Sequence, residues 1–284
     1  MESVYLYDGS EEGFFTAVFS AYENKERDAF VYRKEGFQPR LDETLREVST
    51  DNEKSARVRA KLQKTAGADA LQDICTALRS GDAEAPNKAF RYVAVCLKYG
   101  FFAIERQSDP DVFDFCALLQ QVRLEVHRFT GFLRFHETAQ GYFYAHYAPD
   151  NDVTALLLPH FTARLRGTPF FIHDVRRNVL AFYNGLTTRI LQGSGQITVF
   201  LSENERAFTD LWQTYYDAVN VESRKNERLM RGFMPARYWS HLPEKSKPLV
   251  AARPSMPAQR GASAQQSAAI RSAAAGTPAA KPAP

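Results

Sequence analysis

The hydrophobic pattern changes its period at Gly131, and this change constrains the fold more than any other feature of the sequence. Before it, apolar residues from Val112 to Phe129 recur at alternating steps of three and four, which is the pattern of an amphipathic helix. After it, the segment from Phe132 to His136 alternates apolar and polar side chains, as a half-buried strand does. Because glycine adopts the left-handed C-cap conformation without steric cost, we expect the helix to end at Gly131.

The alternating pattern extends over a predicted sheet region, residues 131–184. Turn residues separate four predicted strands, at 132–136, 142–146, 170–174 and 179–183. A helical pattern at 152–166 lies between the second and third strands, so the order is β-β-α-β-β. We predict an antiparallel sheet with this helix on its apolar face. The opposite face would carry Arg134, His136, Tyr144 and His146.

The segment before this sheet, residues 1–130, is predicted to be rich in helix. Short strands are expected at Val4 to Tyr7 and near Ala29 to Tyr32, and Ser10 is a plausible N-cap for a helix between them. Three further helical patterns follow, at 51–64, 67–80 and 86–100. Helical patterns also occupy 203–240, and we expect these C-terminal helices to pack on the sheet.

These patterns predict one α+β domain over residues 1–244, followed by a disordered tail at 245–284. The tail is rich in alanine and proline and has almost no bulky apolar residue, so it cannot offset the entropy of ordering. The stretch 246–284 carries five basic residues and no acidic one, so the preceding chain has a net charge of −2. Any nucleic-acid surface on the folded part must therefore be a local patch.

Composition also narrows the class of protein. No apolar run approaches the roughly 18 residues of a membrane span, and the N-terminal segment does not resemble a signal peptide. Cys75, Cys96 and Cys116 are far apart and no CxxC motif occurs, which favours reduced core thiols over a zinc or iron–sulfur site. We therefore expect a cytoplasmic protein without a membrane contact.

Five residues are candidates for acid–base catalysis: Glu125, His127, His160, His173 and Asp174. Carboxyl and imidazole groups transfer protons in many enzymes, and they also bind metal ions. His173 and Asp174 end a predicted strand, where catalytic groups often lie. Neither HExxH nor a comparable ligand spacing is present, so we predict no metal site and no cofactor. His160 lies in an apolar helical pattern, where a core histidine is the more common explanation.

A second set combines cationic, polar and aromatic residues and suits nucleic-acid binding. The guanidinium group matches phosphate oxygens, and aromatic rings stack on bases. Cation–π pairs that fix helices to a sheet are the structural alternative. The set comprises Arg128, Arg134, His136, Tyr144, Arg164, Arg176, Arg177, Arg224, Asn226, Arg228, Arg237, Tyr238 and Trp239.

Several motifs along the chain resemble those of a bacterial family assigned to DNA metabolism or repair and encoded beside a radical-SAM protein. In some members this domain is fused to a uracil-DNA-glycosylase-family domain. The similar segments are YLYDG and EGFFTAVFSAYE within 5–23, EVHRFTGFLRF at 125–135, YAHYAPDNDV at 144–153, HFTAR at 160–164, FIHDVRR at 171–177, LWQTYY at 211–216, ESRKNERL at 222–229 and FMPARYW at 233–239.

This resemblance implies a role in DNA repair or modification, with DNA, a radical-SAM protein and a uracil-DNA-glycosylase-family protein as partners. The chain lacks the CxxxCxxC motif, so it is not the radical-SAM enzyme itself. Three functions follow as hypotheses. The first is a nucleic-acid-binding protein that presents DNA to its partner enzyme. The second is an acid–base or metal-dependent enzyme acting on DNA through the glutamate, histidine and aspartate residues. The third is a protein–protein adaptor.

Overall fold

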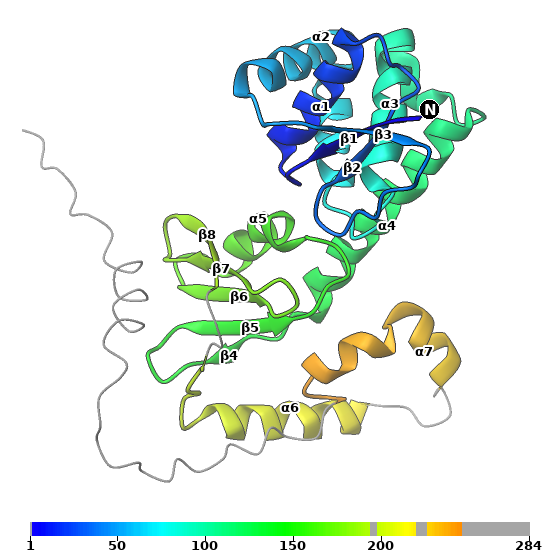
Figure 1. Cartoon of the computed structure of the whole chain (residues 1–284). Coiled ribbons are helices and arrows are strands. Elements are labelled where there is room, and N and C mark those ends of the chain that lie inside the picture. Colours follow the sequence, from blue (N-terminus) through cyan, green and yellow to red (C-terminus); the bar gives the residue numbers. More distant parts are fainter. Residues whose placement is uncertain (1, 194–197, 220–225, 246–284) are drawn as a thin grey trace, which may run out of the picture. The chain divides into compact units, whose positions relative to one another are not determined.

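The computed structural model describes residues 2–193, 198–219 and 226–245 (Figure 1). Contacts within the chain define two compact units. Unit 1 comprises Met1–Phe132 and Ala148–His160, and unit 2 comprises Leu133–Tyr147 and Phe161–Pro284. The single domain expected for residues 1–244 stays a prediction.

Unit 1 contains a small sheet and most of the helices. Its strands are β1 (Glu2–Tyr7), β2 (Phe30–Arg33) and β3 (Glu43–Glu47). Its helices are α1 (Glu11–Glu23), α2 (Asn52–Ala77), α3 (Ala85–Tyr99), the 3-10 helix η1 (Gly100–Glu105) and α4 (Pro110–Phe132). The two strands and the helices expected from the sequence are confirmed, whereas β3 was not predicted because its residues are mostly exposed.

The sheet of unit 1 is parallel, with β1 in the centre of the order β2-β1-β3. Helix α1 connects β1 to β2, so these three elements form a β-α-β unit. The predicted N-cap is confirmed, since the Ser10 hydroxyl accepts a hydrogen bond from the Gly13 N–H at 2.9 Å. Phe14 and Phe15 follow in α1 and are fully buried in the core of this unit.

Two glycines show how helix ends are set in unit 1. Gly67 has a φ of 94°, outside the helical range, so α2 consists of two helical segments that meet where the sequence predicted a boundary. The expected stop at Gly131 is wrong, because α4 continues to Phe132. Gly131 has no positive φ, so it does not adopt the left-handed C-cap conformation on which the prediction rested.

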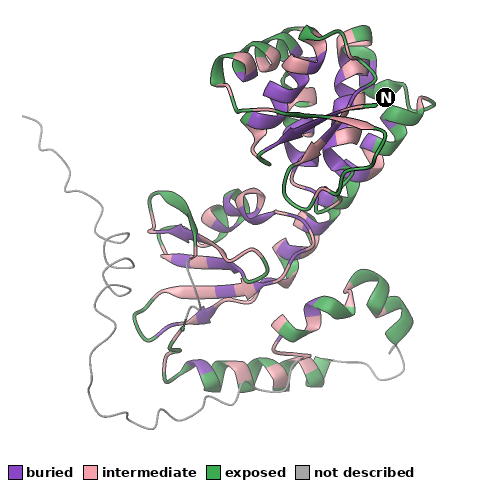
Figure 2. Cartoon of the chain, viewed as in Figure 1, coloured by how far each residue is buried: buried purple, intermediate pink, exposed green. Residues whose placement is uncertain are grey.

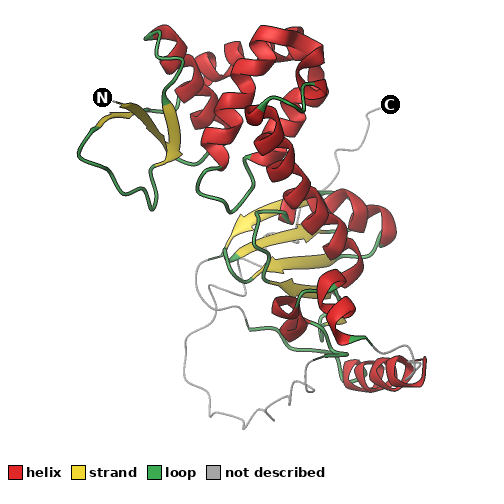
Figure 3. Ribbon diagram, turned by 90° about the vertical axis from the view of Figure 1, so that its right-hand side faces the viewer, coloured by secondary structure: helices red, strands yellow, loops and turns green. Residues whose placement is uncertain are grey.

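Unit 2 is built on a five-stranded sheet with the order β4-β5-β6-β7-β8 (Figure 3). Its strands are β4 (His136–Glu137), β5 (Phe143–Tyr147), β6 (Phe170–Asp174), β7 (Val179–Tyr183) and β8 (Thr188–Gln192). Its helices are α6 (Glu205–Val219), α7 (Glu227–Phe233) and the 3-10 helix η3 (Ala236–His241). Helix α5 (Thr154–Arg164) begins in unit 1 and ends in unit 2.

The expected α+β class is confirmed, but the sheet is mixed instead of antiparallel. Strands β5 and β6 pair in parallel, while the other neighbouring pairs are antiparallel. The cause is α5, because a helical crossover returns the chain to the same end of the sheet and so gives parallel neighbours. The fifth strand, β8, is exposed at every residue, so it lacks the alternation by which the others were predicted.

The packing of α5 on the apolar face of the sheet agrees with the prediction, and of the C-terminal helices, η3 and the start of α6 contact the sheet. Phe161 of α5 packs against Phe135 with ring centroids 5.0 Å apart, and Phe135 packs against Phe170 of β6 at 5.6 Å. Pro235 separates α7 from η3. Helix η3 contacts β5 on the sheet. The tail predicted to be disordered lies outside the described residues except for Lys245.

Candidate functional site

One face of the sheet in unit 2 gathers histidine and tyrosine side chains from three strands. His136 of β4 lies opposite Tyr144 of β5, and His146 of β5 lies opposite His173 of β6. Because side chains two apart on a strand point to the same side, these four residues share one face. We call this set the histidine–tyrosine face. The sequence predicted that Arg134, His136, Tyr144 and His146 share it. The prediction is wrong for Arg134, because β4 begins at His136 and Arg134 lies before it, outside any strand. The parallel pairing of β5 and β6 adds His173.

A chain of hydrogen bonds orients His173 on this face. Its Nε2 lies 3.2 Å from Oδ1 of Asn178, an atom that can only accept, so Nε2 carries the proton. In the neutral ring Nδ1 is then the acceptor, and the Tyr144 hydroxyl donates to it at 2.7 Å. Burial lowers the pKa of His173, so the imidazole is neutral at pH 7. Burial raises the pKa of Tyr144 to about 12, so its hydroxyl keeps its proton.

A second pair joins the sheet to η3. Nδ1 of His146 lies 2.7 Å from Nδ1 of His241, with ring centroids 4.9 Å apart. One ring must donate and the other accept, so the hydrogen bond cannot form when both rings are protonated. Burial and the neighbouring His241, His136 and His173 lower the pKa of His146 to about 4. Burial also lowers the pKa of His241. Both rings are therefore neutral at pH 7.

A third pair fixes the start of α6. Nδ1 of His136 lies 2.7 Å from Oε1 of Glu205, and both residues are buried. The other carboxylate oxygen, Oε2, accepts the N–H of Glu137 at 2.7 Å. Both oxygens of Glu205 are thus hydrogen-bonded to β4, which satisfies a carboxylate that burial would otherwise penalise. The rings of His136 and His146 lie nearly parallel, with centroids 6.5 Å apart.

These contacts define the chemistry available on the face. Neutral imidazoles and a protonated phenol can donate and accept hydrogen bonds, stack on a planar ligand and transfer protons. Among the described residues, no group of three or more histidine, cysteine, aspartate or glutamate side chains is arranged to hold a metal ion.

The five predicted catalytic residues are divided between the two units. Glu125, His127 and His160 belong to unit 1, whereas His173 and Asp174 belong to unit 2, so their convergence stays untested. His127 and His160 are exposed. His160 therefore is not the core histidine that its helical pattern favoured. His173 and Asp174 are consecutive on β6 and point to opposite faces of the sheet.

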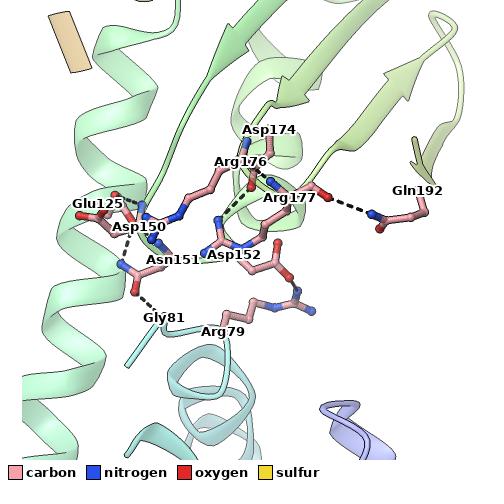
Figure 4. Close-up of polar contacts among 10 residues, drawn as sticks. All are labelled: Arg79, Gly81, Glu125, Asp150, Asn151, Asp152, Asp174, Arg176, Arg177 and Gln192. Atoms are coloured by element: carbon pink, nitrogen blue, oxygen red, sulfur yellow. Dashed lines mark hydrogen bonds and ion pairs between the residues drawn. The ribbon is translucent and has the colours of Figure 1, made fainter. Parts of the chain in front are cut away.

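Glu125 anchors a loop of unit 1 (Figure 4). Its Oε1 accepts the N–H of Asp150 at 2.9 Å. Its Oε2 accepts the backbone N–H of Asn151 at 2.8 Å and the side-chain amide of Asn151 at 2.6 Å. Asn151 in turn accepts the N–H of Gly81 at 3.0 Å through its Oδ1. The contacts of Glu125 thus explain its burial by a structural role.

Asp174 organises the turn between β6 and β7 (Figure 4). Its Oδ1 accepts the N–H groups of Arg176 and Arg177 at 2.9 and 3.1 Å. Its Oδ2 pairs with the guanidinium of Arg177 at 3.0 Å. Asp174 is fully buried and all these partners are local, so its geometry is that of a turn-forming carboxylate.

The predicted nucleic-acid residues fall into engaged and exposed groups. Arg134 pairs with Glu244 at 2.6 Å and lies over the ring of Trp212, so its charge is compensated. Arg128 is half-buried, and the Trp239 indole donates to the carbonyl of Met234 at 3.0 Å. Asn226 caps α7, and Tyr238 is buried. The exposed arginines are Arg164, Arg176, Arg228 and Arg237, while Arg224 lies outside the described residues.

Sequence reasoning missed several members of the site. The sequence did not indicate four residues that hydrogen-bond to site residues: Asn178, Glu205, His241 and Glu244. Each contacts a residue that is far away in the sequence or lies across a turn, and neither kind of contact leaves a periodic pattern. His146 was placed on the correct face by its period but was not named as a candidate. The alternation of polar residues on β5 was the signal that could have found it.

The family model for a domain of unknown function, DUF4130, matches residues 83–244, which is more than half of the chain. The chain therefore belongs to this family. The matched segment contains the whole histidine–tyrosine face and its partners, and it leaves β1, α1 and α2 outside. No curated protein and no solved structure matches the chain. Within the described residues, no helix has the length and apolar character needed to cross a membrane.

Proposed function

We propose that this protein binds nucleic acid through unit 2 in DNA repair or modification, together with a radical-SAM partner enzyme. The setting comes from the motif resemblance described above. The observation that carries the binding proposal is the gathering of His136, Tyr144, His146 and His173 on one sheet face, with exposed arginines in the same unit. The rings of Tyr144 and His146, which are only partly buried, can stack on a base and hydrogen-bond to its edges.

Phosphate contacts are assigned first to the arginines whose side chains are exposed, because a phosphate group can reach them. Arg134 and Arg177 already pair with Glu244 and Asp174. Arg228 and Arg237 are exposed and belong to the C-terminal segment whose helix η3 contacts β5. They are therefore the first pair to test, followed by the exposed Arg164 and Arg176.

The number of phosphate contacts sets the expected salt dependence. If the four exposed arginines each neutralise one phosphate, a single strand should show a slope of about −3 for log K against log salt. Raising the salt from 50 to 200 mM would then weaken binding about 50-fold. The assay is fluorescence anisotropy with labelled single-stranded and duplex oligonucleotides and the full chain.

A paired substitution separates this site from general electrostatics. R228A/R237A removes two phosphate contacts and should reduce the magnitude of the slope by about 1.4 on a single strand. The matched control is R27A/R40A, because Arg27 and Arg40 are exposed arginines of unit 1. The control should leave affinity and slope unchanged. Equal effects of the two variants would contradict the assignment to unit 2.

The partnership with a radical-SAM protein has its own test. The two proteins would be co-expressed, one of them tagged, and purified under anaerobic conditions with and without an oligonucleotide. Co-elution in a fixed ratio is the expected result. Separate elution in both conditions would contradict this part of the proposal.

Acid–base catalysis on DNA is a second candidate function, and the hydrogen-bonded series Tyr144, His173 and Asn178 favours it. A neutral imidazole that accepts from a hydroxyl on one side and is oriented by an amide on the other has the arrangement of a general base. The test is mass spectrometry of oligonucleotides incubated with the protein and its variants H173Q and Y144F. A mass change lost in H173Q but with binding retained would support catalysis, and no mass change in any oligonucleotide would count against it.

A further inference from the structure

A groove in unit 1 is lined by residues that precede the segment matched by the family model, except for Leu97. It has a volume of about 640 Å³ and lies beside α1 and α2, two neighbouring helices at the top of Figure 1. Its lining is mostly apolar. The lining residues are Val18, Phe19, Tyr22, Glu23, Arg57, Val58, Lys61 and Leu97. We propose that this groove binds an acidic amphipathic helix of a partner protein.

A row of positive charges on α2 includes two residues that line the groove, Arg57 and Lys61. Lys54, Arg57, Lys61 and Lys64 follow each other on α2 at steps of three, four and three, so they lie on one side of the helix. Lys54 pairs with Glu23 at 3.4 Å. Within the described part of the chain, no carboxylate forms an ion pair with the other three. The groove therefore has an uncompensated positive edge.

The shape and charge of this region fit a helix. Ten residues separate Lys54 from Lys64, which corresponds to a rise of about 15 Å along α2. A partner helix of about three turns can place apolar residues on the groove and carboxylates against this row. Opposite charges across the edge would favour an acidic partner and reject a basic one.

A protein partner explains the groove better than a nucleic acid does. Val18, Val58 and Leu97 give its floor aliphatic side chains, on which bases do not stack as they do on aromatic rings. The Phe19 ring already has Lys54 and Arg57 over it, at 5.1 and 4.9 Å from its centroid. The tail of this chain is excluded as the occupant by its sign, since 246–284 has five basic residues and no acidic one.

The test uses a synthetic peptide as the probe. A fluorescein-labelled peptide of about 14 residues carries leucines along one helical face and glutamates beside them. Its control peptides replace the glutamates by lysines or the leucines by glutamines. Anisotropy with the full chain should show saturable binding of the glutamate peptide, and binding at least about tenfold weaker for each control.

Charge reversal on the protein makes the test specific. R57E/K61E should weaken the glutamate peptide at least about tenfold and strengthen the lysine peptide, because the edge then attracts the opposite sign. The matched control is R27E/R40E, which reverses two exposed arginines that do not line the groove. Equal effects of the two variants, or no binding of the glutamate peptide, would overturn the proposal.

Two further outcomes separate this groove from the proposed nucleic-acid site. R228A/R237A should leave the peptide affinity unchanged, since both residues belong to unit 2. An unlabelled single-stranded oligonucleotide should not displace the peptide. Displacement that disappears in R57E/K61E would assign the groove to nucleic acid and so overturn the protein-helix proposal.

Discussion

Substituting Glu125 by alanine tests whether this buried carboxylate is structural. The change removes the acceptor of three hydrogen bonds, two from backbone N–H groups and one from the Asn151 side chain. Asn151 is buried, so its two stranded N–H groups cannot turn freely to water. A buried unsatisfied donor costs about 1–3 kcal/mol, and relief of the buried charge offsets part of the sum. We expect E125A to lower the free energy of unfolding of unit 1 by about 3 kcal/mol.

The glutamine variant refines the estimate. E125Q keeps one acceptor oxygen, but its amide group faces at least one N–H group that needs an acceptor. We therefore expect E125Q to lower the free energy of unfolding by about 1–2 kcal/mol. H127Q is the matched control on the same helix. His127 is exposed, and its substitution should change stability by less than about 0.5 kcal/mol.

The cysteines make the assay specific for unit 1. Burial raises the pKa of Cys75 to about 12 and that of Cys96 to about 11, so both thiols are unreactive at pH 7.5 until they are exposed. Urea unfolding would be followed by thiol labelling and by far-UV circular dichroism. An E125A midpoint equal to that of the unsubstituted protein would refute the loop-anchoring role and return Glu125 to the catalytic candidates.

Two further predictions concern pH and backbone geometry. Because the unfolded chain binds a proton at His146 near its ordinary pKa of about 6.5, and the folded chain only near about 4, stability should fall as the pH drops through this window. The free energy of unfolding should fall by at most about 3 kcal/mol, and the tryptophan fluorescence of unit 2 should report this loss. H241Q should make the loss smaller. A free energy of unfolding that does not change from pH 7 to 4 would contradict the neutral His146–His241 pair. G13A should destabilise by about 1–3 kcal/mol in urea unfolding, because its Cβ would lie 2.2 Å from Oδ1 of Asp8. G131A has open space and should stabilise by about 0.5–1 kcal/mol; the reverse order would contradict the account.

Fluorescence reports on unit 2 because both tryptophans of the chain lie there. Trp212 belongs to α6 and Trp239 to η3, the two elements joined to the sheet through Glu205 and His241. The cysteines and the tryptophans therefore give separate signals for the two units. An effect assigned here to one unit should appear first in its own signal.

Periodicity predicted most strands of unit 2 because their burial alternates or is continuous. The strands around Phe143, Phe170 and Val179 were found from their apolar side chains. The direction in which the strands pair was not predicted correctly, because apolar and polar side chains alternate in the same way in parallel and antiparallel strands. The helical pattern between β5 and β6 could have predicted the parallel pair, since a crossover helix such as α5 brings the next strand back in parallel.

The candidate site was predictable only in part for a related reason. Period two placed His136, Tyr144 and His146 on one face, and the register of the sheet then added His173. His241 joins this face through η3, ninety-five residues from His146, and no local pattern encodes such a contact. Glu125 shows the reverse case. A carboxylate beside histidines in the sequence suggested chemistry, yet its oxygens are occupied by loop N–H groups of unit 1.

Burial explains why charge alone overestimated the nucleic-acid surface. Figure 2 shows exposed residues along α6 and α7, while strands β4 to β7 of the sheet are buried or half-buried. Arg134 and Arg177 appear cationic in the sequence, but each lies against a carboxylate with little exposure, Glu244 and Asp174. Whether an arginine can contact a phosphate group therefore depends on its exposure in the fold, which the residue type alone does not give.

The most direct measurement is the affinity of the full chain for a labelled single-stranded oligonucleotide between 50 and 200 mM salt, with R228A/R237A and R27A/R40A beside it. The account predicts binding that weakens about 50-fold across this range and a shallower slope in R228A/R237A only. Absent or salt-independent binding, or equal losses in the two variants, would contradict the proposal that unit 2 binds nucleic acid.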